Sequence, residues 1–267
     1  MKKIVTMAVT FMAGLTLAAC SSNQSAPSSL DKIKEKGTLV VATSPDYAPF
    51  EFQTLVDGKN QIVGSDILLA QKIADELGVK LEISSMNFDN VLNSVQSGKV
   101  DIAIAGLSYS DERAKVFDFS ETYYQVADVL LIKKSNLDAY KELSDLNGKK
   151  VAVQKGSTQE TYAKENMSDS SLVSLGLMGE AINELKSGHV EAVLMDTPVA
   201  LGYAKQNDDL ALATISFPTE KNNAKAIVMP KDSKELKEAI DAVVNKVVEN
   251  KEYDTFLEEA SNYTISE

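Results

Sequence analysis

Short apolar runs alternate along this chain with longer stretches in which apolar residues recur at helical spacing. The runs expected to form strands are residues 38–43, 80–83, 101–104, 126–132, 150–153, 191–195 and 224–229. The stretches expected to form helices are residues 30–36, 66–77, 87–97, 160–166, 180–187, 197–206 and 233–249. Because strands that alternate with helices pair in parallel, the pattern predicts an α/β fold with parallel sheets.

The two halves of the chain repeat one arrangement, in which a strand leads through a loop with small hydroxyl residues into a helix. In the first half, the loop at residues 44–52 contains two prolines that stiffen it, and Asp57-Gly58 predicts a hairpin turn. In the second half, the loop at residues 154–159 follows a strand directly. We therefore expect two α/β lobes that face each other across a cleft.

The first 19 residues differ from the rest and are expected to be removed. Lys2 and Lys3 precede an apolar stretch, residues 4–17, that is too short for a typical membrane span. The stretch ends in Leu17-Ala-Ala-Cys20, which resembles a bacterial lipobox with Cys20 as the acylated first residue of the mature protein. The alternative is an ordinary secretory signal. Residues 21–29 are polar and predict a flexible tether, and the single cysteine excludes an internal disulfide.

The charge of the chain argues against a nucleic-acid partner. Without residues 1–19 the chain loses two lysines and no acid, which leaves 25 basic and 39 acidic side chains and a formal charge of −14. A nucleic-acid-binding protein needs a basic cluster, and the sequence contains none. The charge favours solubility but does not identify a ligand.

Residues 105–124, AGLSYSDERAKVFDFSETYY, contain the strongest candidate site. They follow a predicted strand, and ligands of open α/β sheets bind at the carboxyl ends of strands. Gly106 allows close backbone approach, Ser108 adds a hydroxyl, and Arg113 offers a planar set of donors that suits a carboxylate. The alternative is a surface turn in which Arg113 pairs with Asp111 or Asp118.

Candidates also occur at three other strand ends. Tyr47 and Phe88 could form apolar walls, or they could be ordinary core aromatics. Ser157 and Thr158 follow Gly156 at a helix start, where anions are favoured, although Thr158 could merely cap the helix. Asp196 could balance an ammonium group, or it too could be a helix cap. A carboxylate site together with an isolated acid predicts recognition of an α-amino acid head group.

Five segments carry a resemblance to a known family: SPDYAPFEF, GSDILLAQKIADELG, AGLSYSDERAKVFDFSETYY, VQKGSTQETY and the strand end at Asp196. They resemble the bacterial extracellular solute-binding proteins of family 3, the polar amino acid receptors of ABC importers, over roughly residues 39–256. The resemblance implies a two-lobed periplasmic-binding-protein-like fold of type II with two β crossover hinges. It places lobe 1 at residues 38–124 plus 219–267 and lobe 2 at residues 125–218, after a signal peptide (1–19) and a lipidated tether and lead-in (20–37).

The resemblance also assigns roles to individual residues. In lobe 1, it makes Tyr47 and Phe88 walls of the side-chain pocket and directs the Gly106 carbonyl to the ligand ammonium. Ser108 matches a hydroxyl that contacts the same head group. Arg113 would pair with the ligand carboxylate.

From lobe 2, Thr158 would donate to the same carboxylate, and Asp196 would pair with the ammonium. Ser157 and Gln159 match further contacts.

Ser44 departs from the family pattern. Relatives that bind lysine, arginine or histidine often carry an aspartate at this position, and Asp46 or Glu51 could compensate for its absence here. The GSTQETY segment resembles the branch that binds basic amino acids, whereas AGLSYSDER resembles the glutamine branch equally. We therefore expect a polar L-amino acid, either basic or glutamine-like.

The sequence thus predicts a monomeric, lipid-anchored receptor on the extracellular face of the cell membrane, which delivers an amino acid to an ABC permease. This interpretation needs no catalytic residue, metal or cofactor. The alternatives are an enzyme of the same fold, similar to cyclohexadienyl dehydratase, and an amino-acid sensor domain. An enzyme needs a positioned acid or base, but the only histidine, His189, lies among polar residues and the only cysteine is Cys20. Carboxylates could still serve, so the alternative remains open.

Overall fold

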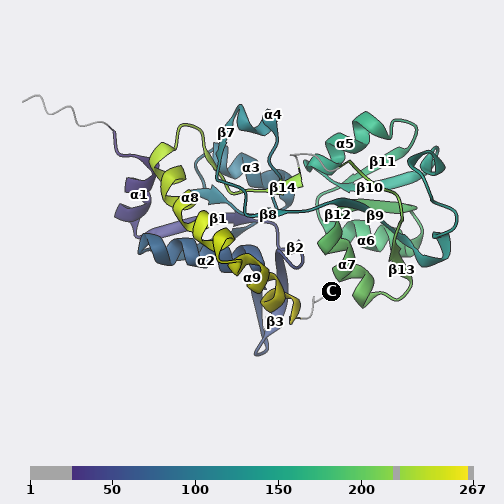
Figure 1. Cartoon of the computed structure of the whole chain (residues 1–267), viewed down its shortest axis with the longest axis horizontal. Coiled ribbons are helices and arrows are strands. Elements are labelled where there is room, and N and C mark those ends of the chain that lie inside the picture. Colours follow the sequence, from purple (N-terminus) through teal and green to yellow (C-terminus); the bar gives the residue numbers. More distant parts are fainter. Residues whose placement is uncertain (1–25, 219–222, 264–267) are drawn as a thin grey trace, which may run out of the picture.

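The computed structural model describes residues 26–218 and 223–263. The predicted signal peptide and Cys20 therefore lie outside the described residues. Two α/β lobes lie side by side and are joined by a narrow waist (Figure 1). No helix within the described ranges is long and apolar enough to span a membrane.

Lobe 1 is built on a five-stranded sheet with the order β5-β1-β6-β15-β7. These strands are β5 (Lys80–Ser85), β1 (Thr38–Thr43), β6 (Ile102–Ala103), β15 (Val228–Pro230) and β7 (Phe117–Phe119). The first three are parallel, whereas β15 is antiparallel to both of its neighbours. The helices of this lobe are α1 (Ser29–Lys36), α2 (Ser65–Leu77), α3 (Phe88–Gln96), α4 (Asp111–Ala114), α8 (Lys234–Glu249) and α9 (Glu252–Ser261).

Lobe 2 has a second five-stranded sheet with the order β11-β10-β12-β9-β13. Its strands are β11 (Ser171–Leu175), β10 (Lys150–Gln154), β12 (Ala192–Asp196), β9 (Asp128–Lys133) and β13 (Leu210–Leu212). The pairs that β10 forms with β11 and β12 are parallel, and the pairs that β9 forms with β12 and β13 are antiparallel. Its helical segments are η1 (Lys134–Asn136), η2 (Leu143–Leu146), α5 (Thr158–Asn166), α6 (Met178–Ser187) and α7 (Thr197–Gln206).

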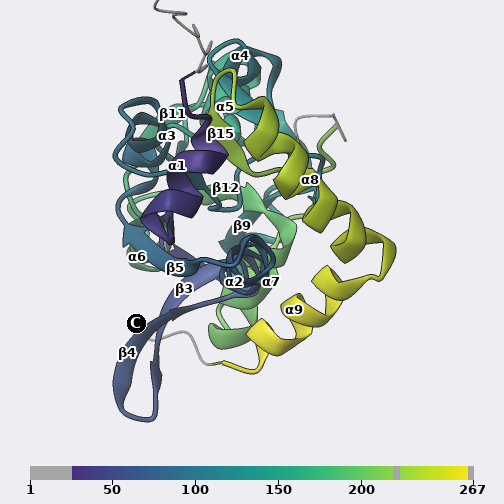
Figure 2. The same ribbon diagram turned by 90° about the vertical axis from the view of Figure 1, so that its left-hand side faces the viewer.

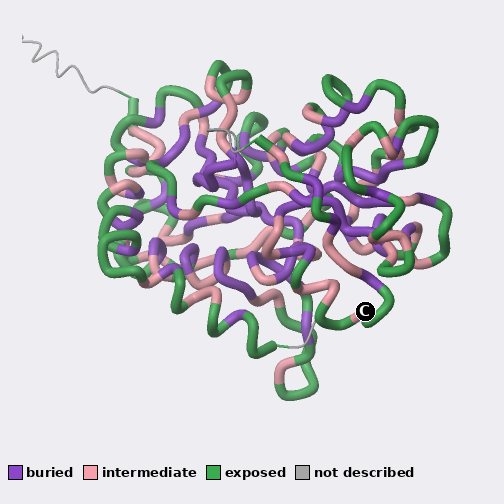
Figure 3. Tube along the Cα trace, turned by 45° about the vertical axis from the view of Figure 1, so that its right-hand side comes forward, coloured by how far each residue is buried: buried purple, intermediate pink, exposed green. Residues whose placement is uncertain are grey.

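Both sheets are covered on both faces, which explains why a central strand such as β9 is apolar over most of its length. In β9, Val129 and Leu131 pack with the α6 and α7 side, whereas Leu130 and Ile132 pack with the α5 side. Alternate residues of a strand point to opposite faces, so a continuous apolar run serves both layers. The buried residues accordingly run through the middle of each lobe (Figure 3).

Two short antiparallel strands, β8 (Tyr124–Gln125) and β14 (Ala224–Lys225), cross between the lobes and pair with each other. An isolated bridge also joins Ser108 to Lys225. These crossings agree with the predicted two-lobed fold with two β crossover hinges.

Most predicted elements are present, and β1 and α7 match their predicted bounds. Gly78, expected to end α2, adopts φ +71° there and donates to the carbonyls of Ala74 and Asp75. A residue without a Cβ tolerates this left-handed conformation, so glycine ends the helix cleanly.

Two predictions about local structure were wrong. The supposed loop at residues 44–52 contains β2 (Asp46–Tyr47) and the start of β3 (Glu51–Val56), which forms a projecting hairpin with β4 (Lys59–Val63) (Figure 2). The apolar run at residues 224–229 is not one strand but two, because β14 belongs to the crossover and β15 to the lobe 1 sheet. The pattern also gave no prediction for β7, β11, β13 and α9.

Candidate functional site

All nine predicted ligand-binding residues surround one cavity of about 10 Å³ between the lobes. Lobe 1 contributes Tyr47, Phe88, Gly106, Ser108 and Arg113, and lobe 2 contributes Ser157, Thr158, Gln159 and Asp196. Two residues that the sequence analysis missed, Gln154 and Lys225, complete the lining. We call these eleven residues the head-group site. Its small volume means that the side chains of the two lobes lie in contact with one another.

Gly106 stands where no larger residue fits. Its φ is +53°, and a Cβ at this position would lie 3.1 Å from the Tyr47 ring. The Gly106 amide donates to Asp66 Oδ2 at 2.7 Å, and the hydroxyls of Tyr123 and Tyr253 donate to the same carboxylate at 3.0 and 2.6 Å. Burial raises the pKa of Asp66, and the hydrogen bonds oppose this effect. This buried network fixes the orientation of the Gly106 peptide.

Arg113, the only arginine in the chain, reaches from α4 across to lobe 2. Its guanidinium donates to the Ser108 carbonyl at 2.7 Å and to the Gly156 carbonyl at 2.9 Å. Burial lowers its pKa to about 10, so the group stays charged at neutral pH. Because carbonyl oxygens do not neutralise it, the guanidinium keeps its charge available for an anion.

The alternative interpretation of Arg113 as part of a surface turn was wrong. Asp118 pairs instead with Lys231 at 3.1 Å, and Asp111 accepts a hydrogen bond from the Tyr109 hydroxyl at 3.0 Å. The guanidinium thus points into the cleft.

Asp196 occupies the N-cap position of α7, but its carboxylate makes no capping hydrogen bond. It turns into the cleft instead, where it is 1% exposed. Its Oδ2 accepts from the Tyr47 hydroxyl at 2.9 Å and from Lys225 Nζ at 2.5 Å, and its Oδ1 accepts from Gln159 Nε2 at 3.0 Å. The capping alternative was therefore wrong, and the acid faces the other predicted site residues.

In the loop after β10, the residue that caps α5 differs from the one considered in the sequence analysis. Ser157, not Thr158, caps α5, because its hydroxyl accepts from the Glu160 amide at 3.0 Å. Thr158 is the first residue of the helix, and its hydroxyl donates to Gln159 Oε1 at 3.3 Å. Gln159 also donates to Asp128 Oδ1 at 2.8 Å. Burial and the neighbouring Asp196 raise the pKa of Asp128 to about 6.

The two aromatic candidates serve the core and the site together. Phe88 is 8% exposed and packs with Ala42 and Leu107 in lobe 1. Tyr47 packs in the larger apolar cluster and stacks on Phe50, while its hydroxyl contacts Asp196 of the other lobe. Core packing and a wall of the site are therefore not alternatives for these side chains.

Lys225 is the most informative residue that the sequence analysis missed. It lies on β14 and is 1% exposed, and its Nζ is 2.9 Å from Ser108 Oγ and 2.5 Å from Asp196 Oδ2. The available signal was a lysine flanked by Ala224 and Ala226 in an apolar run. A lysine is almost never fully buried unless it is paired, so this context already implied a buried acid.

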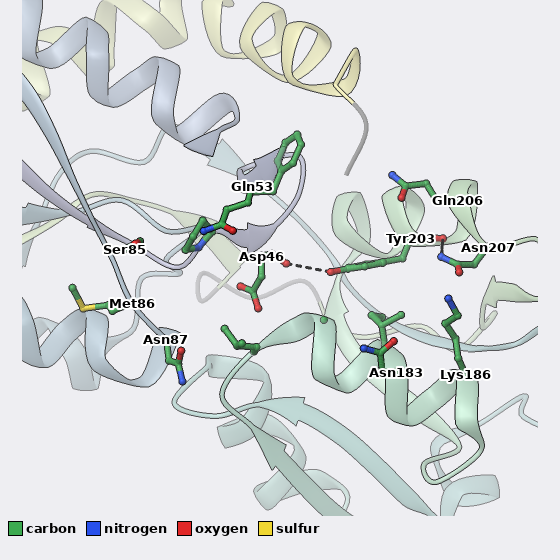
Figure 4. A pocket seen from close by; sticks show the side chains of 15 residues that line it. Asp46, Gln53, Ser85, Met86, Asn87, Asn183, Lys186, Tyr203, Gln206 and Asn207 are labelled. Carbon is green, nitrogen blue, oxygen red and sulfur yellow. Dashed lines mark hydrogen bonds between the residues drawn. The ribbon is translucent and has the colours of Figure 1, made fainter. Parts of the chain in front are cut away.

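Ser44 and Asp46 lie beside the head-group site rather than in it. The Ser44 hydroxyl donates to Asp46 Oδ1 at 3.2 Å, and the Asp46 Oδ2 accepts from the Met178 amide at the start of α6. Tyr203 also donates to the Asp46 carbonyl at 3.2 Å. Asp46 lines a separate groove of about 520 Å³ (Figure 4). This groove is larger but lacks the converging residues of the head-group site, so the predicted residues do not gather at the larger opening.

Neither of the acids suggested as substitutes for an aspartate at position 44 lines the head-group site. Asp46 faces the groove, and Glu51 is fully buried. Burial and the nearby Asp66 raise the pKa of Glu51 well above its usual value. Across residues 26–218 and 223–263, no group of three or more His, Cys, Asp or Glu side chains is placed to hold a metal.

Residues 39–260 match the model of the bacterial extracellular solute-binding proteins, family 3. The chain is a family 3 solute-binding protein. Among curated relatives of this solute-binding protein is the arginine-binding extracellular protein ArtP of Bacillus subtilis, 33% identical over 94% of this chain and 95% of ArtP.

Two crystal structures from Streptococcus pneumoniae resemble this solute-binding protein more strongly. One, an amino acid ABC transporter substrate-binding protein bound to L-arginine, is 52% identical with a TM-score of 0.88, and covers 90% of this chain and 100% of its own. The other, AbpA bound to L-arginine, is 55% identical with a TM-score of 0.85, and covers 88% of this chain and 99% of its own. These relatives have the same two-lobed fold over nearly their whole length.

Proposed function

We propose that this protein is the substrate-binding component of an amino acid ABC importer and that L-arginine is its ligand. The observation that carries the proposal is the meeting of Arg113 from lobe 1 and Asp196 from lobe 2 at one site. A guanidinium and a carboxylate placed in this way complement the two charges of an α-amino acid. The arginine-bound relatives at 52% and 55% identity support the choice of arginine over glutamine.

Each end of the ligand would meet groups suited to it. Arg113 would hold the α-carboxylate together with the Thr158 hydroxyl, and Asp196 would hold the α-ammonium with Ser108 and the Gly106 carbonyl. The rings of Tyr47 and Phe88 would pack against the side chain, and a guanidinium gains cation–π energy over an aromatic face.

Capture would proceed by closure of the lobes. A ligand that contacts both lobes favours the closed state only through contacts that the open state lacks. Closure would also exclude water, which strengthens the charged contacts. This mechanism involves no covalent chemistry, and it assigns the protein to the binding proteins rather than to the enzymes of the same fold.

Membrane attachment would come from Cys20. Removal of residues 1–19 and acylation of Cys20 would give two acyl chains, which are enough for stable anchoring. The protein would then act as a monomer on the extracellular face and hand its ligand to a permease. Mass spectrometry of the mature protein tests this part, because an intact or an unacylated N-terminus would contradict it.

Calorimetric titration of the purified mature chain tests the ligand. We expect arginine to bind, glutamine to bind more weakly, and agmatine, which lacks the α-carboxylate, to be rejected. Recovery of unchanged arginine after incubation would favour a receptor, whereas turnover would favour the enzyme alternative. Binding of agmatine as strongly as arginine would contradict the role of Arg113.

A further inference from the structure

Lys225 occupies the position that the proposed ligand ammonium requires. Its Nζ lies 2.9 Å from Ser108 Oγ and 2.5 Å from Asp196 Oδ2, the two side chains assigned to that ammonium. A lysine ammonium and an α-ammonium carry the same charge and three N–H donors each. The residue therefore presents to the site the same chemical group as the ligand.

Three hydrogen bonds already engage the Asp196 carboxylate. Oδ2 accepts from both Tyr47 and Lys225, and Oδ1 accepts from Gln159, so only one of about four acceptor positions is left for a second ammonium. The cavity of about 10 Å³ leaves too little space for another charged group beside Lys225. Two ammonium groups so close in a buried site would also repel each other strongly.

Other acids lie within electrostatic range of Lys225. Glu51 is fully buried, and neither of its carboxyl oxygens has a hydrogen-bond partner among the residues that the structure describes. Burial raises the pKa of Glu51, and the positive charge of Lys225 opposes that rise, which places the two groups within electrostatic range. The same charge acts on Asp128 and Asp66.

We infer that Lys225 is an internal competitor for Asp196, which the ligand ammonium must displace and which thereby sets the affinity of the site. The inference rests on the proposed function, because it needs a ligand that carries an ammonium group. Lys225 also contacts both lobes, since Ser108 belongs to lobe 1 and Asp196 to lobe 2. In this arrangement it neutralises a buried acid that otherwise would have no cation at hydrogen-bond distance.

The test compares Lys225→Met with the unmodified protein by calorimetry, using two ligands. These are arginine and 5-guanidinopentanoate, which is arginine without its α-amino group. Met removes the charge but keeps a long apolar side chain, so we expect arginine to bind about tenfold more tightly, the scale of one lost hydrogen bond to a charged group. The control is Lys234→Met, whose side chain is 80% exposed and lies outside the site.

The second ligand separates competition from simple support of the fold. In the unmodified protein, Lys225 can return to Asp196 when the ligand has no ammonium, so removing the amino group should weaken binding only slightly. In Lys225→Met the same removal leaves Asp196 buried without a cation and should weaken binding about a hundredfold. If Lys225→Met unfolds, Lys225→Gln replaces it, because an amide keeps a donor without the charge.

Weaker or unchanged arginine binding by the folded variant would overturn the inference. So would an equal loss of affinity in the variant and the unmodified protein when 5-guanidinopentanoate replaces arginine. Absence of arginine binding by the unmodified protein would instead overturn the proposed ligand. In that case, the same comparison is made with the amino acid that does bind and its deaminated form. Lys225 and the choice of arginine are thus tested separately.

Discussion

The sheets of the two lobes have the same topology, but the side chains at their facing edges carry opposite charges. Each sheet has five strands with the same sequence of parallel and antiparallel pairs, so that β1 corresponds to β10 and β6 to β12. The fourth strand in each order follows a crossover from the other lobe, β15 in lobe 1 and β9 in lobe 2. The scaffold therefore does not distinguish the lobes.

The residues that follow corresponding strands do distinguish them. After β6 come Gly106, Ser108 and, further on, Arg113, which give lobe 1 a cationic edge. At the end of β12 stands Asp196, which gives lobe 2 an anionic one. In the proposed function, a zwitterion would be recognised by neither lobe alone but by the pair, which would couple recognition to closure.

The largest effect should follow removal of either charge. Arg113→Ala and Asp196→Ala should each weaken arginine binding by about 2–5 kcal/mol, because truncating one partner of a buried charge pair leaves the other unpaired. Arg113→Lys should restore binding only in part, since an ammonium cannot reproduce the planar guanidinium. Calorimetry on variants whose folding is verified by circular dichroism measures both.

The matched control for Asp196 is Asp138→Ala, which also removes an acid from lobe 2 but at an exposed position, where it pairs only with Lys141. It should bind normally. If one of the two site variants also bound normally, the complementary roles of the lobes would be disproved.

A smaller effect should follow changes at the aromatic walls. Tyr47→Ala and Phe88→Ala should each weaken binding by about 1–3 kcal/mol, the scale of a lost buried aromatic contact. Tyr47→Phe keeps the ring and removes the hydroxyl, which donates to Asp196 Oδ2 and accepts from the Asp196 amide, so it should cost about 1 kcal/mol. Equal losses for Tyr47→Phe and Tyr47→Ala would show that the ring does not contact the ligand.

The smallest effect concerns Asp46, which joins the lobes outside the head-group site. Burial raises its pKa from 3.8 to about 6, so the folded protein binds a proton there more readily than the unfolded chain. The resulting stability is full below pH 3.8 and is lost as the pH rises through about 6. From about pH 7 to about pH 5, the free energy of unfolding should therefore gain about 1 kcal/mol from this group.

Urea unfolding of the unmodified protein and of Asp46→Asn at both pH values measures this gain as a difference, which removes the contribution of Asp128. The amide of Asn does not titrate but can still accept from the Met178 amide. A pH dependence that is the same in both proteins would mean that Asp46 is not the titrating group.

The sequence predicted those candidate site residues whose type and whose position at a strand end were both informative. Arg113 and Asp196 follow predicted strands of different lobes. Ligands bind at the carboxyl ends of such strands, and the two lobes were expected to face each other across a cleft, so the meeting of the two residues was predictable. The sequence could not decide whether Asp196 caps α7 or faces the site, because an aspartate at the start of a helix suits both roles. Its partners, Tyr47 and Lys225, are 149 and 29 residues away in the chain. The local pattern suggests a buried acid near Lys225 but does not identify Asp196 as that acid.

The run at residues 224–229 shows a second limit. Its apolar residues favour one strand, and its local propensity does not change at Ala226. The division into β14 and β15 depends on which strands of the two lobes are available for pairing, and this is a property of the tertiary fold. Lys225 was missed for the same reason, since a single strand in the lobe 1 sheet would not have placed it between the lobes.

The pairing of β8 with β14 limits how the molecule can move. Two unpaired connections would let the lobes twist and slide, but strands that hydrogen-bond to each other act as one short ribbon with a single bending direction. The proposed opening and closure would then be close to a motion with one degree of freedom, so the two lobes would meet a ligand in the same relative orientation each time. The backbone of Lys225 lies on that ribbon, close to the axis, so its distance from both lobes changes least during the motion.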